Sequence, residues 1–328
     1  MADRIAWGIL GTGRIARAFA KGLRASKTGV LAAVGSRSLG KASAFCDEFG
    51  GSPHGSYESL LDDARVQAVY IATPHHTHAG LTVAAARAGK AILCEKPFTL
   101  SLREAETALQ EVRRAGVFFM EAFMYRCHPQ IAKLRELLAD GAIGAPTYAH
   151  SEFGFDAPDD WDDFRADPAL GGGALMDVGT YCVSFSLLVA GSDFHRAEYR
   201  VRKHPRGYDA VGAGLLSFPD GFVATFATAV HQELRNGAVV YGRKGRIELD
   251  SPWVPGPGAT LRLVRQGGAE EFRLHPEGGD LYAMEADAAA ASLSLRECAA
   301  MPWRDTLENM RALDALRRSA DLLIPESR

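Results

Sequence analysis

A glycine-rich turn directly follows the first apolar run of the chain. Residues 5–10 read Ile-Ala-Trp-Gly-Ile-Leu, and residues 11–16 read Gly-Thr-Gly-Arg-Ile-Ala. The apolar run predicts a strand that is buried on both faces. Gly11 permits a tight turn, Gly13 lets a pyrophosphate approach the backbone, and Ala16 allows close helix–strand packing. The order strand, turn, helix therefore predicts a dinucleotide site with the helix amino terminus facing the phosphates.

Strands and helices alternate through the first part of the chain. The predicted strands cover residues 5–10, 30–35, 68–72, 91–93 and 118–120, and the predicted helices cover 15–24, 41–49, 78–88 and 102–115. Alternation at this spacing predicts right-handed βαβ units and a parallel sheet with helices on both faces.

The pattern changes after residue 122. Helices are predicted at 129–139, through Asp177 and Tyr181 to about 189, at 282–294 and at 306–319, and strands at 147–155, 197–202, 211–218, 222–229, 238–241, 246–249, 261–264 and 271–274. Consecutive strands joined by short turns favour an antiparallel sheet. We therefore expect an α/β chain with a Rossmann dinucleotide-binding domain at 1–122. A second α+β domain at 123–328 would be built on a large, mainly antiparallel sheet, and its last helix could pack back on the first domain.

Size, charge and cysteine content narrow the class of protein. The 328 residues exceed the length at which one core usually stops growing. A net charge of −3 and a pI near 6.4 give no electrostatic footprint for nucleic acid. Five widely spaced cysteines without C-x-x-C are typical of reduced thiols. The first strand begins at Ile5, which leaves no room for a signal peptide, and no apolar run reaches membrane-spanning length. We expect a cytoplasmic protein without nucleic-acid or membrane partners.

A lysine follows the strand predicted at residues 91–93, in the sequence Cys94-Glu95-Lys96-Pro97. The carboxyl end of a strand in such a sheet borders the crevice where ligands bind. Pro97 restricts the backbone of Lys96, so a long amine is aimed toward the cofactor. An amine in a partly desolvated cleft is suited to proton chemistry. The alternative is a surface lysine that ends a strand.

The end of the second predicted strand bears on the choice of cofactor. An acidic residue there would bind the ribose 2′-hydroxyl of NAD, but the chain has Ser36-Arg37-Ser38. Arg37 can pair with a 2′-phosphate, and Ser36 and Ser38 can donate to it. The pattern favours NADP, with NAD possible; the alternative is a solvated loop arginine.

Three histidines lie close together after the third predicted strand. They belong to the run Thr73-Pro74-His75-His76-Thr77-His78. Zinc sites usually take ligands from separate segments, together with carboxylate or thiolate groups. We therefore expect no metal site, and a loop that lines the nicotinamide half of the cleft.

Asp177 and Tyr181 are four positions apart and follow the glycines at 171–173. That spacing predicts both side chains on one face of a helix, near its start. A tyrosine close to a lysine can act with it in general acid–base catalysis at a carbonyl group. The alternative is a carboxylate that serves the helix amino terminus and a tyrosine packed in the core.

Four motifs together carry a resemblance over nearly the full chain. They are residues 7–16, Ala72-Thr73-Pro74, Cys94-Glu95-Lys96-Pro97 and residues 171–179. The chain resembles the Gfo/Idh/MocA oxidoreductases, named after glucose–fructose oxidoreductase, inositol dehydrogenase and rhizopine catabolism. Many members end the last motif in histidine, where this chain has Tyr181. That variant, with residues 121–126, 245–249 and Trp253, is similar to the dimeric dihydrodiol dehydrogenase and NADP-dependent D-xylose dehydrogenase branch.

The resemblance implies roles for individual residues. Lys96 and Tyr181 would form the acid/base pair, and Asp177 would orient the substrate. Residues expected to bind the cofactor, from the resemblance and from the patterns above, are Gly11, Gly13, Arg14, Ile15, Ser36, Arg37, Ser38, Thr73, Pro74, His75, His78, Glu95, Lys96 and Arg126. Trp253 matches an aromatic residue of the substrate pocket in that branch. Apart from the resemblance, the aromatic side chains of Phe153 and Trp161 are also expected to offer apolar surface to the substrate. The resemblance also implies a cis bond between Lys96 and Pro97, and homodimers or homotetramers built through the C-terminal sheet.

The expected activity is reversible, NADP(H)-dependent hydride transfer to or from a secondary alcohol of a monosaccharide or cyclic diol. Other functions remain open, because function resides in the site and not in the fold. A non-catalytic NADP(H) sensor would bind the cofactor without turnover. Cofactor-dependent glycoside cleavage would show no net redox change, and a zinc hydrolase is the weakest alternative.

Overall fold

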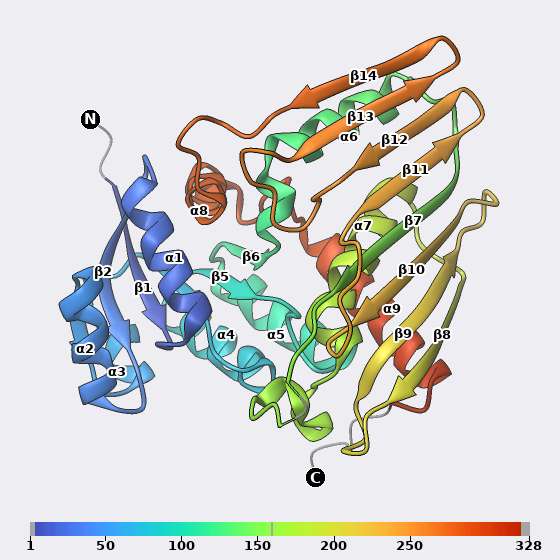
Figure 1. Cartoon of the computed structure of the whole chain (residues 1–328). Helices are drawn as coiled ribbons and strands as arrows, with labels where there is room; N and C mark the ends of the chain where they lie inside the picture. The colour runs from blue at the N-terminus through green and yellow to red at the C-terminus, as the bar shows by residue number, and fades with distance from the viewer. Residues whose placement is uncertain (1–3, 159, 323–328) are drawn as a thin grey trace. The chain divides into compact units, whose positions relative to one another are not determined.

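The computed structural model describes residues 4–158 and 160–322 and divides the chain into two compact units (Figure 1). The first unit runs up to Thr99 and includes Arg103–Cys127 and Gly278–Thr306. The second unit includes Leu100–Leu102, His128–Glu277 and the chain from Leu307 onward. The division is thus more interleaved than one cut after residue 122, because a late segment rejoins the first unit.

The first unit is built on a six-stranded parallel sheet in the order β3-β2-β1-β4-β5-β6. Its strands are β1 (Ile5–Leu10), β2 (Gly29–Gly35), β3 (Ser52–His54), β4 (Ala68–Ile71), β5 (Ala91–Glu95) and β6 (Phe119–Ala122). Its helices are α1 (Arg14–Ala25), α2 (Leu39–Phe49), α3 (Tyr57–Leu61), α4 (His78–Arg87), α5 (Leu102–Ala115) and α8 (Leu281–Ser292), with 3₁₀ turns at His75–Thr77, Met124–Cys127 and Leu293–Leu295. The predicted Rossmann sheet is confirmed. β3 and α3 escaped prediction because segments of three and five residues are too short to show periodicity.

The core of this unit lies around the middle strands. Every residue of β4 is buried, as are the last four of β1. The ring of Phe19 on α1 stacks on Tyr70 of β4, with ring centroids 3.9 Å apart, and Trp7 packs edge-on against Phe19 at 5.4 Å. Each such buried aromatic side chain contributes roughly 2–3 kcal/mol of hydrophobic stabilisation. The sheet is therefore a rigid base for the loops at its carboxyl edge.

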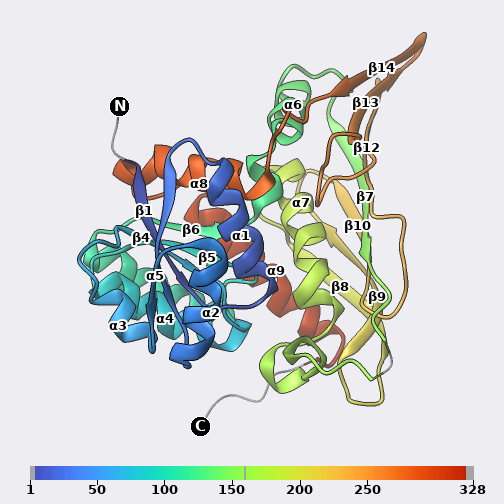
Figure 2. The same cartoon turned by 60° about the vertical axis from the view of Figure 1, so that its left-hand side comes forward.

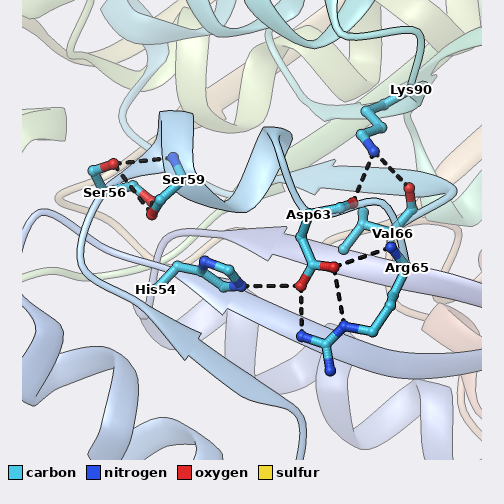
Figure 3. A network of polar contacts seen from close by, with 7 residues as sticks. All are labelled: His54, Ser56, Ser59, Asp63, Arg65, Val66 and Lys90. Atoms are coloured by element: carbon cyan, nitrogen blue, oxygen red, sulfur yellow. Dashed lines mark hydrogen bonds and ion pairs between the residues drawn. The ribbon is translucent and has the colours of Figure 1, made fainter.

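A polar network joins β3 to the turn after α3 and to the segments before β4 and β5 (Figure 3). The carboxylate of Asp63 accepts hydrogen bonds from Arg65 and contacts His54 Nε2 at 3.2 Å. Lys90 Nζ donates to the carbonyls of Asp63 and Val66, at 2.9 and 2.8 Å. Val66 precedes β4 and Lys90 precedes β5. The Lys90 ammonium therefore connects the amino-terminal ends of two adjacent strands.

The second unit is built on an eight-stranded sheet in the order β14-β13-β12-β11-β7-β10-β9-β8. Its strands are β7 (Pro146–Gly154), β8 (Arg196–Lys203), β9 (Asp209–Ser217), β10 (Val223–Ala229), β11 (Ala238–Gly242), β12 (Gly245–Leu249), β13 (Thr260–Arg265) and β14 (Gly268–Arg273). Neighbouring strands are antiparallel except for the parallel pair β7–β10. The expected mainly antiparallel sheet is confirmed, and the long crossover between β7 and β10 accounts for the exception.

Helices cover one face of this sheet. They are α6 (Pro129–Ala139), α7 (Thr180–Ala190) and most of α9 (Trp303–Ser319), with short 3₁₀ turns at Phe164–Ala166 and Pro168–Leu170. α7 packs on the central strands β7 and β10 (Figure 2). A π-helical turn at Leu175–Gly179 precedes α7, where a continuous α-helix was predicted.

The segment that contains α7 corrects one expectation from the sequence. Pro168–Ala190 is long and apolar enough, by length and composition, to cross a membrane. The statement that no apolar run reaches that length was therefore wrong. In the structure 89% of the most apolar stretch is buried inside the protein, as in the core helix of a folded domain.

Candidate functional site

The turn after β1 has the geometry of a phosphate-binding loop. Gly11 has φ +112°, and a Cβ there would lie 2.6 Å from the carbonyl oxygen of Ala72. Gly13 is exposed, and a Cβ there would have nothing within 4 Å. Gly13 also forms the N-cap of α1 without a side-chain hydrogen bond, so no side chain caps the first-turn amides, which include those of Arg14 and Ile15. An open backbone at an uncapped helix terminus fits a pyrophosphate.

The three polar residues predicted to select NADP follow β2 directly. Ser36 is buried and Arg37 is exposed. The Ser38 side chain caps α2 by accepting a hydrogen bond from the amide of Lys41 at 3.4 Å. The Ser38 hydroxyl can still donate its own proton. The carboxyl end of β2 thus presents an exposed guanidinium where an adenosine 2′-phosphate would bind.

The imidazole of His78 holds the loop after β4 through a hydrogen-bonding contact with its backbone. The imidazole is fully buried, with Nε2 2.7 Å from the carbonyl oxygen of Thr73 and Nδ1 3.0 Å from that of Pro97. Burial lowers the pKa of His78 to about 4, against the opposing effect of the two carbonyls. The neutral ring donates from one nitrogen only. His78 therefore braces two loops and does not expose its ring.

The neighbouring histidines do not gather around a common point. His75 is buried and His76 exposed, and the rings of His75 and His78 are 5.9 Å apart. Within residues 4–158 and 160–322, no group of three or more His, Cys, Asp or Glu side chains could hold a metal ion. Thr73 and Thr77 share a hydroxyl hydrogen bond of 2.6 Å, and Thr77 donates to the carbonyl of Pro74, which shapes the loop.

The end of β5 presents the predicted catalytic lysine. The Lys96–Pro97 bond is cis, as the resemblance implied. Glu95 is buried and accepts hydrogen bonds from the Tyr70 hydroxyl and, at 3.2 Å, from the Lys96 amide. Lys96 itself is half-buried at the carboxyl edge of the sheet. The strand end is thus fixed by Glu95, which leaves the lysine side chain to extend from a rigid position.

Arg126, predicted to bind the cofactor, is held inside the first unit. Its side chain has no exposed surface and forms an ion pair with Asp305. Its Nε also lies 3.4 Å from the Tyr125 hydroxyl. Arg126 therefore anchors the first turn of α9, and its cofactor role stays a prediction.

Asp177 lies in the second unit and has a partner that the sequence did not indicate. Asp177 is 5% exposed, and its Oδ2 lies 3.2 Å from Arg165 Nη1. The guanidinium of Arg165 also donates two hydrogen bonds to Asp163, at 2.9 and 3.0 Å. One guanidinium thus bridges two carboxylates. No local motif marks Arg165, because the pairing joins a loop to a helix across twelve positions.

Tyr181 belongs to a cluster of aromatic rings. Its ring lies edge-on to Phe153 at 5.2 Å and is 6.1 Å from Trp253. Phe153 and Trp253 are nearly parallel at 5.8 Å, and Phe185 approaches Trp253 edge-on. Trp253 is 1% exposed and donates from Nε1 to the carbonyl of Glu152 at 2.7 Å. Trp253 therefore supports the rings of Tyr181 and Phe153, and the partly exposed Phe153 offers the accessible surface.

Trp161, the third aromatic residue predicted to contact substrate, packs with Phe153 against one cluster of buried residues in this unit. Its ring lies edge-on to Phe155 at 5.8 Å, and the guanidinium of Arg165 lies over it at 4.8 Å. Through Arg165, Trp161 is connected to Asp177. Its contact with substrate stays a prediction.

The three glycines before Asp177 are each required for a different reason. Gly171 ends a 3₁₀ turn with φ +79°. A Cβ on Gly172 would lie 2.4 Å from the carbonyl oxygen of Arg165. Gly173 has φ +113°, and a Cβ there would lie 1.9 Å from Asp209 Oδ1. The run thus packs the helix start against the loop of Arg165 and against Asp209.

Two family models match the chain, one in its N-terminal part and one in its C-terminal part. Residues 5–123 match the oxidoreductase family with an NAD-binding Rossmann fold, Gfo/Idh/MocA. Residues 131–248 match the Gfo/Idh/MocA C-terminal domain.

Two related sequences cover most of the chain. The trans-1,2-dihydrobenzene-1,2-diol dehydrogenase of Mus musculus is 35% identical over 81% of this chain and 79% of its own length. The D-xylose 1-dehydrogenase (NADP(+)) 2 of Haloferax volcanii is 34% identical over 96% of this chain and 97% of its own.

Two solved structures are similar over 97% of this chain and 98% of their own. A 3-ketoreductase from Actinomadura kijaniata in complex with NADP and TDP-benzene has a TM-score of 0.87 at 30% identity. An aldose-aldose oxidoreductase from Caulobacter crescentus complexed with glycerol has a TM-score of 0.89 at 25% identity. The chain therefore belongs to the Gfo/Idh/MocA family of oxidoreductases.

Proposed function

We propose that this oxidoreductase is an NADP(H)-dependent dehydrogenase that acts on a secondary alcohol of a monosaccharide or cyclic diol. The observation that carries the proposal is the start of α7, where Asp177 and Tyr181 are presented together, one beside Arg165 and the other beside Phe153. A carboxylate, a phenol and a ring face are the groups that bind a polyhydroxylated ring. The diol and xylose dehydrogenases among its relatives support this substrate class.

The first unit fits the cofactor on three observations. Gly13 leaves the amino terminus of α1 open to a pyrophosphate, and Gly11 has a backbone that only glycine adopts without strain. Arg37 is exposed after β2, where it would pair with the 2′-phosphate of NADP. When bound, the nicotinamide supplies the hydride chemistry. The NADP complex of the similar ketoreductase supports the same choice.

Side chains of the protein would transfer the proton of the reacting substrate hydroxyl. We propose that the Tyr181 hydroxyl exchanges the proton of the reacting substrate hydroxyl, and that the Lys96 ammonium assists it. Asp177, oriented by Arg165, would accept a hydrogen bond from a neighbouring hydroxyl. Phe153 would pack against the apolar face of the ring.

The direct test is a screen for NADP⁺ reduction over pentoses, hexoses, inositols and dihydrodiols, with NAD⁺ as control. We expect turnover with a sugar or diol and a preference for NADP⁺. Tyr181→Phe should abolish most of that turnover, whereas Tyr148→Phe, on the exposed side of β7, should not. Cofactor binding without oxidation across the panel would favour the sensor function. Bound cofactor with glycoside cleavage and no net reduction would favour the glycosidase.

We also propose assembly through the sheet of the second unit and a cytoplasmic location. The stacked, exposed rings of Tyr148 and Tyr241, 5.8 Å apart, give that sheet an apolar surface suited to a second copy. Light scattering on the purified protein would show a dimer or tetramer, and a monomer at micromolar concentration would contradict the assembly. The five free cysteines are compatible with a reducing compartment.

A further inference from the structure

The carboxylate of Asp209 lies at the start of the helix that carries Asp177 and Tyr181. Asp209 begins β9 and is 2% exposed. Its Oδ2 accepts a hydrogen bond from the amide of Leu175 at 2.7 Å and from the hydroxyl of Tyr199 at 2.8 Å. Leu175 opens the π-helical turn, so the carboxylate satisfies one of the amides that a helix start leaves unpaired.

The helix start is shaped around this carboxylate. Gly173 has φ +113°, and a Cβ there would lie 1.9 Å from Asp209 Oδ1, so a side chain at 173 and the carboxylate exclude each other. On the next residue, the carbonyl of Ala174 accepts a hydrogen bond from Thr228 at 3.0 Å. The segment 173–175 is therefore held from two strands, β9 and β10.

The charged and titratable groups around Asp209 come from three elements. Tyr199 belongs to β8, Arg317 to α9, and Cys182 on α7 acts on Tyr199. Burial raises the pKa of Asp209 to about 6, while the hydrogen bonds from Tyr199 and Leu175 and the charge of Arg317 act in the opposite direction.

The direction of this shift means that ionised Asp209 lowers the stability of the fold. A raised pKa gives stability that is fully present below the ordinary value of 3.8 and is lost as the pH rises through about 6. At neutral pH the ionised carboxylate is therefore less stabilising than the protonated carboxyl would be. A group retained at a cost in stability is expected where activity needs it.

We propose that Asp209 is a positioning residue for the substrate half of the site: with Tyr199 it holds the start of the helix and thereby directs Asp177 and Tyr181. This inference rests on the proposed function of those two residues. The ionised carboxylate accepts both hydrogen bonds, whereas a protonated carboxyl must place a donor in the same crowded space.

Hydrogen–deuterium exchange tests this without turnover. At about pH 7.5, above the raised pKa, Asp209→Asn should speed exchange of amides in segment 173–181 by roughly tenfold, the equivalent of one weakened hydrogen bond to a charged group. Tyr199→Phe removes one donor and leaves the carboxylate, so it should have a smaller effect. Tyr148→Phe, which removes a 2.6 Å hydroxyl contact with Thr225 on the same sheet, should have none. Equal exchange in Asp209→Asn and wild type would overturn the proposal.

Thermal stability separates positioning from a purely structural role. Because Asp209→Asn cannot ionise, its Tm should lack the part of the wild-type decline that occurs as the pH rises through about 6. A Tm that falls together with uniformly faster exchange across the second unit would overturn the proposal, since it would make Asp209 an ordinary stabilising group.

Kinetics give a second readout. Asp209→Asn should lower kcat by roughly tenfold or more while the KM for NADP⁺ stays unchanged, because a small displacement of reacting groups suffices for such a loss. The pH profile of kcat should change near pH 6, because the variant has no carboxyl group that titrates there, and an unaltered pH profile would overturn the proposal. Absence of turnover in the wild type would count against the proposed function, and the exchange rates would then decide the role of Asp209.

Discussion

Arg165 Nη1 lies 3.2 Å from Asp177 Oδ2, and the same guanidinium donates two further hydrogen bonds to the carboxylate of Asp163. The carbonyl oxygen of Arg165 also accepts a hydrogen bond from the amide of Gly173 at 2.8 Å. Side chain and backbone of one loop residue thus both hold the helix that carries Asp177. The direction of that carboxylate is therefore set by a loop that the sequence pattern did not connect with it.

Replacement of Arg165 should harm substrate handling more than cofactor binding. Arg165→Gln removes hydrogen bonds to a charged group, which are worth roughly 2 kcal/mol, so kcat/KM for the sugar or diol should fall about 30-fold. Asp163→Asn is the matched control, because it weakens the other side of the pair and should cost less. Steady-state kinetics check this. An unchanged kcat/KM in Arg165→Gln would separate Asp177 from substrate binding.

Removal of the Lys96 ammonium should abolish most of the hydride transfer and leave NADP⁺ binding in place. Lys96→Met keeps the apolar stem, and general acid–base groups contribute about 100-fold to 10,000-fold to the rate. Single-turnover measurements at saturating cofactor and substrate isolate this step. Lys21→Met, at an exposed position of α1, serves as control. A transfer rate equal to that of wild type in Lys96→Met would refute the catalytic assignment.

Arg37 should decide between NADP⁺ and NAD⁺. Arg37→Ala removes an exposed guanidinium after β2, so we expect the Kd for NADP⁺ to rise roughly 10-fold to 100-fold, as for loss of a charge-assisted hydrogen bond. The Kd for NAD⁺ should stay the same, because NAD⁺ has no 2′-phosphate. Fluorescence titration of both cofactors measures the two constants. Equal losses for both cofactors, or a wild-type preference for NAD⁺, would contradict the pairing.

Gly13 should matter for the cofactor and not for the fold. A Cβ at this position meets nothing within 4 Å, and φ is −74°, so Gly13→Ala should leave the Tm nearly unchanged. The added methyl group should still weaken NADP⁺ binding, because a pyrophosphate must approach the backbone there. Gly173→Ala is the opposite case: its Cβ would lie 1.9 Å from Asp209 Oδ1, and the Tm should drop by several degrees. Unaltered NADP⁺ affinity in Gly13→Ala would remove the phosphate role.

Glu285 should make the first unit less stable as the pH rises. It is fully buried on α8, and neither carboxyl oxygen has a hydrogen-bond partner among the described residues. Burial, then the nearby charge of Glu95 and Cys298, raise its pKa well above the usual range. The neutral carboxyl therefore contributes stability that is present below its ordinary pKa and is lost as the pH rises through the raised value.

Glu285→Gln should flatten that dependence and raise the Tm at alkaline pH. Thermal melts between about pH 5 and 9 cover the range above the ordinary glutamate pKa. Glu106→Gln, on the exposed side of α5, is the control and should follow the wild type. A parallel decline of Tm in Glu285→Gln and wild type would show that another group is responsible.

Long elements with a regular pattern were predictable from the sequence. Helix 102–115 and helix 129–139 begin and end in the structure where the pattern predicted, and β1 does so as well. The apolar positions of the two helices repeat over enough turns to show their period, and β1 is a continuous apolar run. The short β3 and α3 do not, and the π-helical turn at Leu175–Gly179 depends on contacts with Asp209 and Arg165. The sequence of residues 175–179 by itself does not indicate those contacts.

Some residues of the candidate site were likewise predictable from the sequence, and others were not. Glycine geometry and residue type at strand ends are local properties, so Gly11, Gly13, Arg37 and Lys96 could be read from the chain. The sequence by itself thus determined the Rossmann sheet, the mainly antiparallel second sheet and the family. Only the tertiary structure decided what holds the candidate catalytic side chains: Arg165 against Asp177, Asp209 against the helix start, and Trp253 beside Tyr181. Those pairs join segments distant along the chain, and packing selects them because a buried polar group must find its partner wherever the fold brings one close.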